Sequence, residues 1–185
     1  RLKKEVLKDL PDKIEKNMAA RMEQKQKELY HAHAQRLALM LQNQTEEEFA
    51  DSRFQVLSEL TRLRQLCCDP ALVYENYEGG SAKLDLCIEL IQSAVESGHK
   101  ILLFSQFTSM IEILTARLQE ESISCFVLQG STKKEQRAQM VEQFNRDDTS
   151  VFCISLKAGG TGLNLTGADI VIHYDPWWNV AVENQ

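Results

Sequence analysis

The sequence predicts an α/β protein in which helices cover both faces of a parallel β-sheet, with a helical hairpin inserted ahead of the sheet. From about residue 79 onward, apolar β-rich runs alternate with segments whose apolar residues recur at the helical period. Strands that are apolar along their whole length are typical of parallel sheets buried on both faces. Between about residues 23 and 70, Glu, Gln, Lys, Ala, Leu and Met dominate instead, and these residues favour helices.

The helical hairpin is predicted from two adjoining segments, of which residues 23–43 form the first helix. The pattern Thr45-x-x-Glu48 is a capping box, in which the two side chains bond N–H groups at the start of a helix. It predicts a second helix, which ends at Asp69-Pro70 because Pro disfavours the α conformation in the residue before it. We expect the apolar residues of this second helix to form its buried face: Phe49, Val56, Leu57, Leu60, Leu63 and Cys67.

The α/β part begins with a predicted helix over residues 81–97, which stops at Gly98. The elements expected after it are a strand at 100–105, a helix with apolar residues from Phe107 to Leu118, a strand at 123–128, a helix around Met140 to Phe144, and strands at 150–155 and 169–174. Ligands of such sheets bind beyond the carboxyl ends of the strands. Four loops are expected to meet there: Ser105-Gln106, Gly130-Ser131, Lys157–Gly162 and Tyr174-Asp175.

The loop after the strand at 150–155 holds three glycines in four residues, Gly159, Gly160 and Gly162. Glycine adopts positive φ without a steric cost, and the exposed N–H groups of such a loop can face an anion. Phosphate from a nucleotide or a nucleic-acid backbone is one interpretation, and an ordinary tight turn is the other. The loop lacks the dinucleotide-binding fingerprint, and the chain has no Walker A pattern. A bound nucleotide would therefore need another phosphate cradle.

Composition narrows the classes of function. The 185 residues carry a formal net charge of −6, which argues against a generally basic nucleic-acid-binding surface. Contacts with phosphate must then come from local clusters such as Lys3-Lys4-Lys8 and Lys133-Lys134-Arg137, unless these are solvated helix faces. No run approaches the roughly 18 apolar residues of a membrane helix. The five cysteines and four histidines show no ligand spacing, so we predict no metal site and the reduced thiols of an intracellular protein.

Several segments of the chain match one known family when they are taken together: Lys100–Phe107, Leu128–Thr132, Ser155–Leu165, His173–Asn179 and Glu183–Gln185, with Arg1–Pro11 and Leu63–Pro70 upstream. They resemble the second RecA-like lobe of superfamily 2 helicases, and more narrowly the SWI/SNF family of double-stranded-DNA translocases, in which the first and third of these segments correspond to motifs IV and V. The Asp-Pro-Trp-Trp-Asn run beside the glycine loop is specific to this family.

The resemblance implies a RecA-like fold in three parts. Residues 1–22 are a linker and first strand leading from a missing first lobe, residues 23–70 are a helical protrusion, and residues 71–185 are a helicase C-terminal lobe that stops before motif VI. It implies that the full-length protein uses ATP and Mg²⁺. This fragment then holds no catalytic residue, binds neither stably and does not hydrolyse ATP alone. The implied partners are double-stranded DNA and the first RecA-like lobe, with no membrane and with a further protein partner at the hairpin.

The resemblance also implies roles for individual residues. Gly159, Gly160 and Asp175 are expected to sense the nucleotide, and the Asp175 carboxylate is further expected to brace the glycine loop or to cap the turn at Pro176. The expected DNA contacts lie along the four converging loops: Ser105, Gln106, Gly130, Ser131, Lys133, Lys134, Thr161, Gly162, Trp177 and Trp178. Ordinary packing is the alternative for the two tryptophans, and ordinary surface lysines for Lys133 and Lys134.

Two other classes of function stay open at the level of sequence. One is a non-catalytic α/β module whose hairpin docks a partner protein. The other is the lobe of a helicase that separates strands of RNA or forked DNA. The compartment is expected to be the cytoplasm of a bacterium or the nucleus of a eukaryote.

Overall fold

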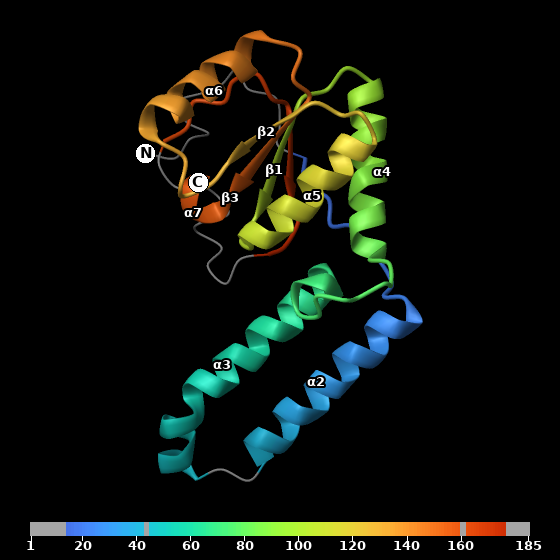
Figure 1. The fold of residues 1–185 in the computed structure, drawn as a ribbon, viewed down its shortest axis with the longest axis vertical. Coiled ribbons are helices and arrows are strands. Elements are labelled where there is room, and N and C mark those ends of the chain that lie inside the picture. The colour runs from blue at the N-terminus through green and yellow to red at the C-terminus, as the bar shows by residue number, and fades with distance from the viewer. Residues whose placement is uncertain (1–13, 43–44, 160–161, 177–185) are drawn as a thin grey trace.

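A four-stranded parallel sheet forms the centre of the α/β unit (Figure 1). The computed structural model describes residues 14–42, 45–159 and 162–176. The strands are β1 (Ile101–Ser105), β2 (Cys125–Leu128), β3 (Val151–Ser155) and β4 (Ile170–His173), in the spatial order β2-β3-β1-β4. Every neighbouring pair is parallel, so all four carboxyl ends lie at one edge of the sheet. The predicted fold class is confirmed.

Helices pack on both faces of this sheet because the strand side chains alternate between two apolar cores. On one face, Ile101 and Leu103 of β1 join the buried residues of α4 (Ala82–Glu96) and α5 (Thr108–Glu120). On the other face, Leu102 of β1 and Phe152 of β3 pack with α6 (Lys134–Arg146). Figure 1 shows α4 and α5 together on one side of the strands and α6 on the other.

Local signals define the ends of these helices. The Ser81 hydroxyl accepts a bond from the Leu84 N–H and caps α4, and the chain leaves that helix at Gly98 with φ of +83°. At the carboxyl end of α6, the Lys100 ammonium donates to the Phe144 and Asp147 carbonyls, which would otherwise lack partners. A single turn of helix, α7 (Leu156–Gly159), follows β3 directly.

The hairpin consists of α2 (Gln24–Gln42) and α3 (Glu46–Cys68), which pack antiparallel in Figure 1. The capping box of α3 is confirmed, since Thr45 and Glu48 bond each other's backbone N–H groups. The small hairpin core contains Leu37, Val56 and Leu63.

The expectation that Phe49 and Leu57 are buried is wrong, because their side chains are 46% and 55% exposed. A two-helix hairpin has only one packed seam, and these two residues lie off that seam. The helical period alone does not reveal how wide the covered stripe is.

The hairpin meets the α/β unit at the carbonyl of Cys68, the last residue of α3. The Tyr174 hydroxyl and the Ser81 hydroxyl both donate to this carbonyl, at 2.8 and 2.7 Å. A 3₁₀ turn, η1 (Pro70–Leu72), then leads toward α4. Nearby, the Arg64 guanidinium donates to the carbonyl of Pro176. The end of α3 is therefore held by the segment that follows β4.

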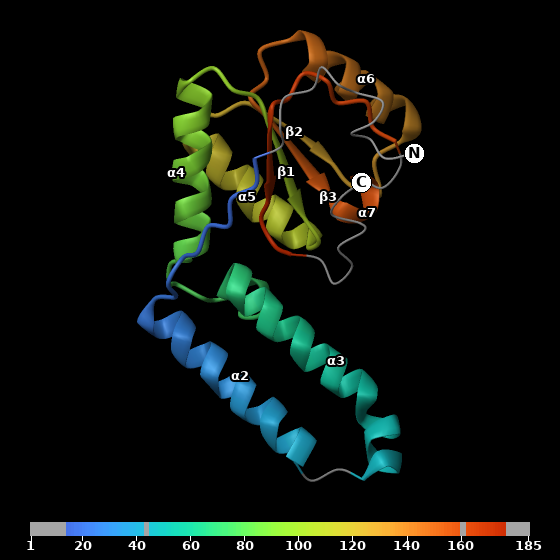
Figure 2. The same cartoon turned by 180° about the vertical axis from the view of Figure 1, so that it is seen from behind.

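Residues 14–22 lie in neither a helix nor a strand. The strand that we expected within residues 1–22 is thus not found in this part, and residues 1–13 lie outside the described ranges. Figure 2 shows residues 14–22 running from the start of α2 along the α/β unit. Within the described ranges, none of the helices combines the length and the apolar character that crossing a bilayer requires.

Candidate functional site

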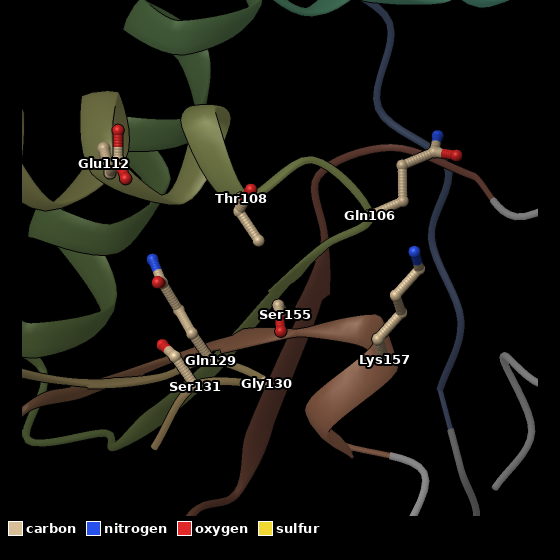
Figure 3. Close-up of a pocket in the computed structure, with 8 residues that line it drawn as sticks. All are labelled: Gln106, Thr108, Glu112, Gln129, Gly130, Ser131, Ser155 and Lys157. Carbon is tan, nitrogen blue, oxygen red and sulfur yellow. The ribbon is translucent and has the colours of Figure 1, made fainter.

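The carboxyl edge of the sheet contains a cavity of about 270 Å³. Its walls come from the segments that follow β1, β2 and β3, as Figure 3 shows: Gln106, Thr108, Glu112, Gln129, Gly130, Ser131, Ser155 and Lys157. Because parallel strands deliver their carboxyl ends to one edge, segments distant in sequence meet here. Three of the four predicted loops thus line one pocket.

Ser155 lies at the centre of the pocket in Figure 3. It is the last residue of β3 and is only 2% exposed, yet its hydroxyl has no hydrogen-bond partner among the described residues. The Nε2 atom of Gln106 is likewise buried without a partner in the described structure. Buried polar atoms are nearly always bonded, so two unpartnered ones at a single pocket indicate a site for an external acceptor.

The polar side chains divide between two walls. Figure 3 shows Glu112, Gln129 and Ser131 on one side of Ser155, and Gln106 and Lys157 on the other. The Lys157 wall therefore carries the positive charge and the Glu112 wall the negative charge.

The amino terminus of α5 adds a further positive potential. Thr108, its first residue, lines the pocket, and the N-cap residue Phe107 contributes no side-chain bond. The free N–H groups and the dipole at a helix amino terminus favour an anion. Together with Lys157, this helix end makes the site suited to one phosphate group.

The glycine loop is anchored at both ends by α6. At its entry, Arg137 donates to the Ala158 carbonyl in α7, at 3.1 Å. At its exit, Asn145 donates to the Asn164 carbonyl and accepts from the Gly167 N–H, both at 2.9 Å. Arg137, which the sequence grouped with a basic cluster, thus contacts the loop backbone.

Within this loop, Gly162 is exposed and has φ of +53°. Positive φ is the backbone conformation for which a glycine was expected in this loop. Gly159 ends the short helix α7. Gly160 and Thr161 lie outside the described residues, as do Trp177 and Trp178, and the predictions for these four stay predictions. Gly130 lines the pocket as expected, and a Cβ built on it would meet no atom within 4 Å.

Ser105 and Asp175 are both buried, and neither lines the pocket. The Ser105 hydroxyl donates to Asp175 Oδ1 at 2.5 Å, and the Gln106 N–H donates to Oδ2 at 3.1 Å. The Asp175 carboxylate therefore braces the loop after β1. Its predicted brace on the glycine loop stays a prediction, because residues 160–161 of that loop lie outside the described residues. Ser105, expected at the DNA surface, is fully buried and does not line the pocket.

Lys133 and Lys134 are exposed at the start of α6 and lie outside the pocket lining, so their predicted contact with DNA stays a prediction. Ser155 and Thr108 were missed as site residues. Ser155 could have been found, because it ends β3 just as Ser105 ends β1, and the two are paired in the sheet. No cluster of three or more His, Cys, Asp or Glu suited to a metal occurs in the described part of the chain.

Comparison with known families agrees with this geometry. The family model described as "Helicase conserved C-terminal domain" matches residues 82–185, and that of the "SNF2-related domain" matches residues 1–72. The solved structure of the Sulfolobus solfataricus SWI2/SNF2 ATPase C-terminal domain superimposes with a TM-score of 0.82 at 33% identity, over 94% of this chain and 76% of that one. The chain belongs to the SWI/SNF family.

Two further relatives of this SWI/SNF chain are much longer than it is. It is 37% identical to a Mycoplasma pneumoniae protein named an uncharacterized ATP-dependent helicase, over all of this chain but 18% of that relative's length. It also resembles the S. solfataricus SWI2/SNF2 ATPase core solved in complex with double-stranded DNA, with a TM-score of 0.81 and 30% identity over 95% of this chain and 38% of that one. The chain thus spans about a fifth of the curated relative that it matches.

Proposed function

We propose that this chain is the second lobe of an ATP-dependent motor that moves along double-stranded DNA, and that the pocket at the carboxyl edge holds one phosphate of the DNA backbone. The observation that carries the proposal is the buried, unpartnered hydroxyl of Ser155 at the centre of this pocket. A phosphate oxygen is a strong acceptor for such a hydroxyl. Contacts of this kind fix the position of a protein on DNA without reading its sequence.

The surrounding groups fit the same ligand. Gln106 and Lys157 provide donors on one wall, and the start of α5 provides a helix amino terminus. Gly130 and Ser131 extend the proposed contact along the backbone of the same DNA strand. Glu112 lies on the wall opposite Lys157, so the phosphate is drawn toward the Lys157 side (Figure 3).

The family resemblance supports further proposed contacts with the DNA backbone beyond the pocket. Thr161, Gly162, Trp177 and Trp178 follow the pocket along the chain, and Lys133 and Lys134 add positive charge at the exposed start of α6. Gly159 and Gly160 are proposed to sense the nucleotide across the cleft between the lobes. Ser105 is proposed to act through the loop that it supports.

ATP and Mg²⁺ do not fit the described residues alone. The sequence lacks a Walker A pattern, and the described residues contain no carboxylate cluster suited to a metal. The proposed partner for nucleotide binding is therefore the first RecA-like lobe. As the two lobes close and open, each one grips the DNA backbone in turn. A protein partner at the hairpin, and an intracellular site of action in cytoplasm or nucleus, belong to the same proposal.

The decisive experiment measures ATP hydrolysis by the full-length protein with and without duplex DNA. We expect stimulation by duplex DNA, weaker stimulation by single-stranded DNA and none by RNA. Ser155→Ala and Lys157→Gln should each raise the DNA concentration needed for half-maximal stimulation. The logarithm of the DNA affinity falls linearly with the logarithm of the salt concentration. Because Lys157 is proposed to neutralise a phosphate, its loss should also reduce the magnitude of this slope by about one.

A matched control comes from Glu142→Gln on the exposed surface of α6, where Glu142 pairs with its helix neighbour Arg146 at 2.8 Å. This variant should behave as wild type. If duplex DNA does not stimulate the wild-type protein, the motor proposal fails. If stimulation occurs but the two pocket variants match the control, the pocket is not the phosphate site.

A further inference from the structure

The carboxylate of Asp175 organises the turn between β1 and α5. Its Oδ1 accepts from the Ser105 hydroxyl at 2.5 Å, and its Oδ2 accepts from the Gln106 N–H at 3.1 Å. The Ser105 hydroxyl in turn accepts from the Phe107 N–H at 3.2 Å. Three consecutive residues of the turn are thus tied, directly or through one hydroxyl, to a single buried side chain.

The bonds to Asp175 connect the β1 and β4 segments beyond the point where backbone hydrogen bonding between the two strands stops. Parallel pairing of β1 with β4 ends at Phe104 and His173, and the Tyr174 N–H makes one more bond, to the Phe104 carbonyl at 2.9 Å. Beyond this point, the Asp175 side chain takes over the role of the ladder. Bonds to a carboxylate are shorter and stronger than neutral ones, and burial strengthens them further. The turn is therefore held in one position.

The turn held in this way carries two residues that line the pocket. Gln106 directly follows Ser105, and Thr108 begins α5. The segment 174–176, which contains Asp175, also bonds the hairpin, through the Tyr174 hydroxyl to the Cys68 carbonyl and through the Pro176 carbonyl to Arg64. One short segment after β4 thus fixes the position of Gln106 and Thr108 relative to the end of α3.

We propose that Asp175 is a positioning residue for the phosphate pocket, which fixes the Ser105–Thr108 turn so that Gln106 and the amino terminus of α5 face the DNA backbone. This inference rests on the proposed function. It assigns to Asp175 no contact with DNA or nucleotide.

The chain offers a matched control at the other end of the same strand pair. Asp169 precedes β4, and its carboxylate accepts from the Lys100 N–H at 3.1 Å and pairs with His99 at 2.5 Å. Asp169 and Asp175 thus each accept a backbone N–H bond from a residue next to β1, at opposite ends of that strand, although Asp169 is exposed and Asp175 is buried. Asp169→Asn makes the same chemical change far from the pocket.

The test compares Asp175→Asn with Asp169→Asn in the full-length protein. An Asn side chain has one acceptor oxygen where the carboxylate has two, so it cannot accept from Ser105 and Gln106 on separate oxygens as Asp175 does. For Asp175→Asn we expect the half-stimulating concentration of duplex DNA to rise about tenfold, equivalent to about 1.4 kcal/mol. The KM for ATP should stay near the wild-type value. Asp169→Asn should leave both quantities unchanged.

Hydrogen exchange gives a readout that does not depend on DNA. Peptides covering residues 105–108 should exchange faster in Asp175→Asn, and peptides covering residues 99–101 should exchange faster in Asp169→Asn. Ser105→Ala, which keeps the bond from the Gln106 N–H to Asp175, should produce a smaller effect in the same direction. This second variant decides the question if Asp175→Asn does not fold.

Three results would overturn the inference. The first is faster exchange at residues 105–108 with an unchanged DNA requirement. The second is a raised KM for ATP without a change in the DNA requirement, which would assign Asp175 to nucleotide contact. The third is a half-stimulating DNA concentration that rises as much in Asp169→Asn as in Asp175→Asn. Absence of DNA stimulation in the wild-type protein would overturn the proposed function, and this inference with it.

Discussion

The carboxylate of Glu59 is buried between the two helices of the hairpin and is bonded from several directions. The His33 ring lies 3.0 Å from one oxygen through Nδ1, and its Nε2 lies 2.8 Å from the Tyr74 hydroxyl. Arg62 bonds the other oxygen at 2.8 Å, and Arg36 lies 3.7 Å from it. Such a network holds the two helices in one register, because each member loses its partners if the helices slide.

The pH dependence of the hairpin follows from this network. Burial alone would raise the pKa of Glu59, but the bond to His33 and the charges of Arg36 and Arg62 outweigh it and hold the pKa below its ordinary value of 4.5. A lowered folded-state pKa gives a stabilisation that is complete above pH 4.5 and is lost as the pH falls through the folded value. We expect Glu59→Gln to lower the free energy of unfolding at pH 7 by about 2 kcal/mol.

Urea denaturation at pH 7 and in the acid range checks this expectation. Glu59→Gln should also lose part of the decline in stability at acid pH. Glu142→Gln, on the exposed side of α6, should change the unfolding free energy by less than about 0.5 kcal/mol. An unaltered pH profile in Glu59→Gln would contradict the assignment.

Cys125 is the thiol that we expect to react first. A hydrogen bond with the Cys153 thiol lowers its pKa, although partial burial acts in the opposite direction, and Cys125 is half-buried at the edge strand β2. Burial raises the pKa of both Cys68 and Cys87 to about 12. Because the thiolate is the nucleophile, timed iodoacetamide labelling near neutral pH should modify Cys125 before these two. Faster labelling of Cys67, which is also half-buried, would contradict the prediction.

At the scale of elements, the segment after the glycine loop lies close against α6 at Gly167. A Cβ built on Gly167 would lie 3.0 Å from the Asn145 Cα and 3.1 Å from its Oδ1. Gly167→Ala must therefore push the segment away from α6 and weaken the two bonds that Asn145 makes. We expect a loss of about 1–3 kcal/mol in unfolding free energy, which is the usual cost of overpacking.

Gly130→Ala is the matched control for this effect, because its Cβ would meet nothing within 4 Å. Thermal or chemical unfolding of both variants measures the difference. Equal destabilisation by the two substitutions would mean that backbone flexibility, rather than contact with α6, explains the need for Gly167.

The elements were predicted better than their contacts, and for physical reasons. The Thr45 capping box and the Gly98 stop are local signals, and both were read correctly from sequence. The partner of Asp175 could not be read in this way, because it depends on β4 lying beside β1, which periodicity does not determine. Ser105 was expected at the surface for the same reason. The sequence shows that the strand ends in a polar residue, but it does not show which residue bonds to that side chain.

At the scale of the whole molecule, a local site must bind an anion against the overall charge. The chain carries a formal net charge of −6, whereas the pocket holds Lys157, two unpartnered polar atoms and the start of α5. A site of this kind captures one or a few phosphates through short-range contacts, so its affinity alone is small. Under the proposed function, binding to DNA then depends on a second contact from the other lobe.

This dependence gives a prediction for the isolated chain. Joining two weak grips in one protein makes the second contact intramolecular, which raises the overall affinity by roughly 10²–10⁴-fold. We therefore expect residues 1–185 alone to bind duplex DNA at least about 100-fold more weakly than the full-length protein, in fluorescence anisotropy at equal salt. The log–log salt slope should also be smaller for the isolated chain, because fewer phosphates are neutralised. Lys157→Gln should reduce this slope further, and Glu142→Gln should not. Equal affinity of the isolated chain and the full-length protein would mean that this lobe carries the DNA grip without its partner.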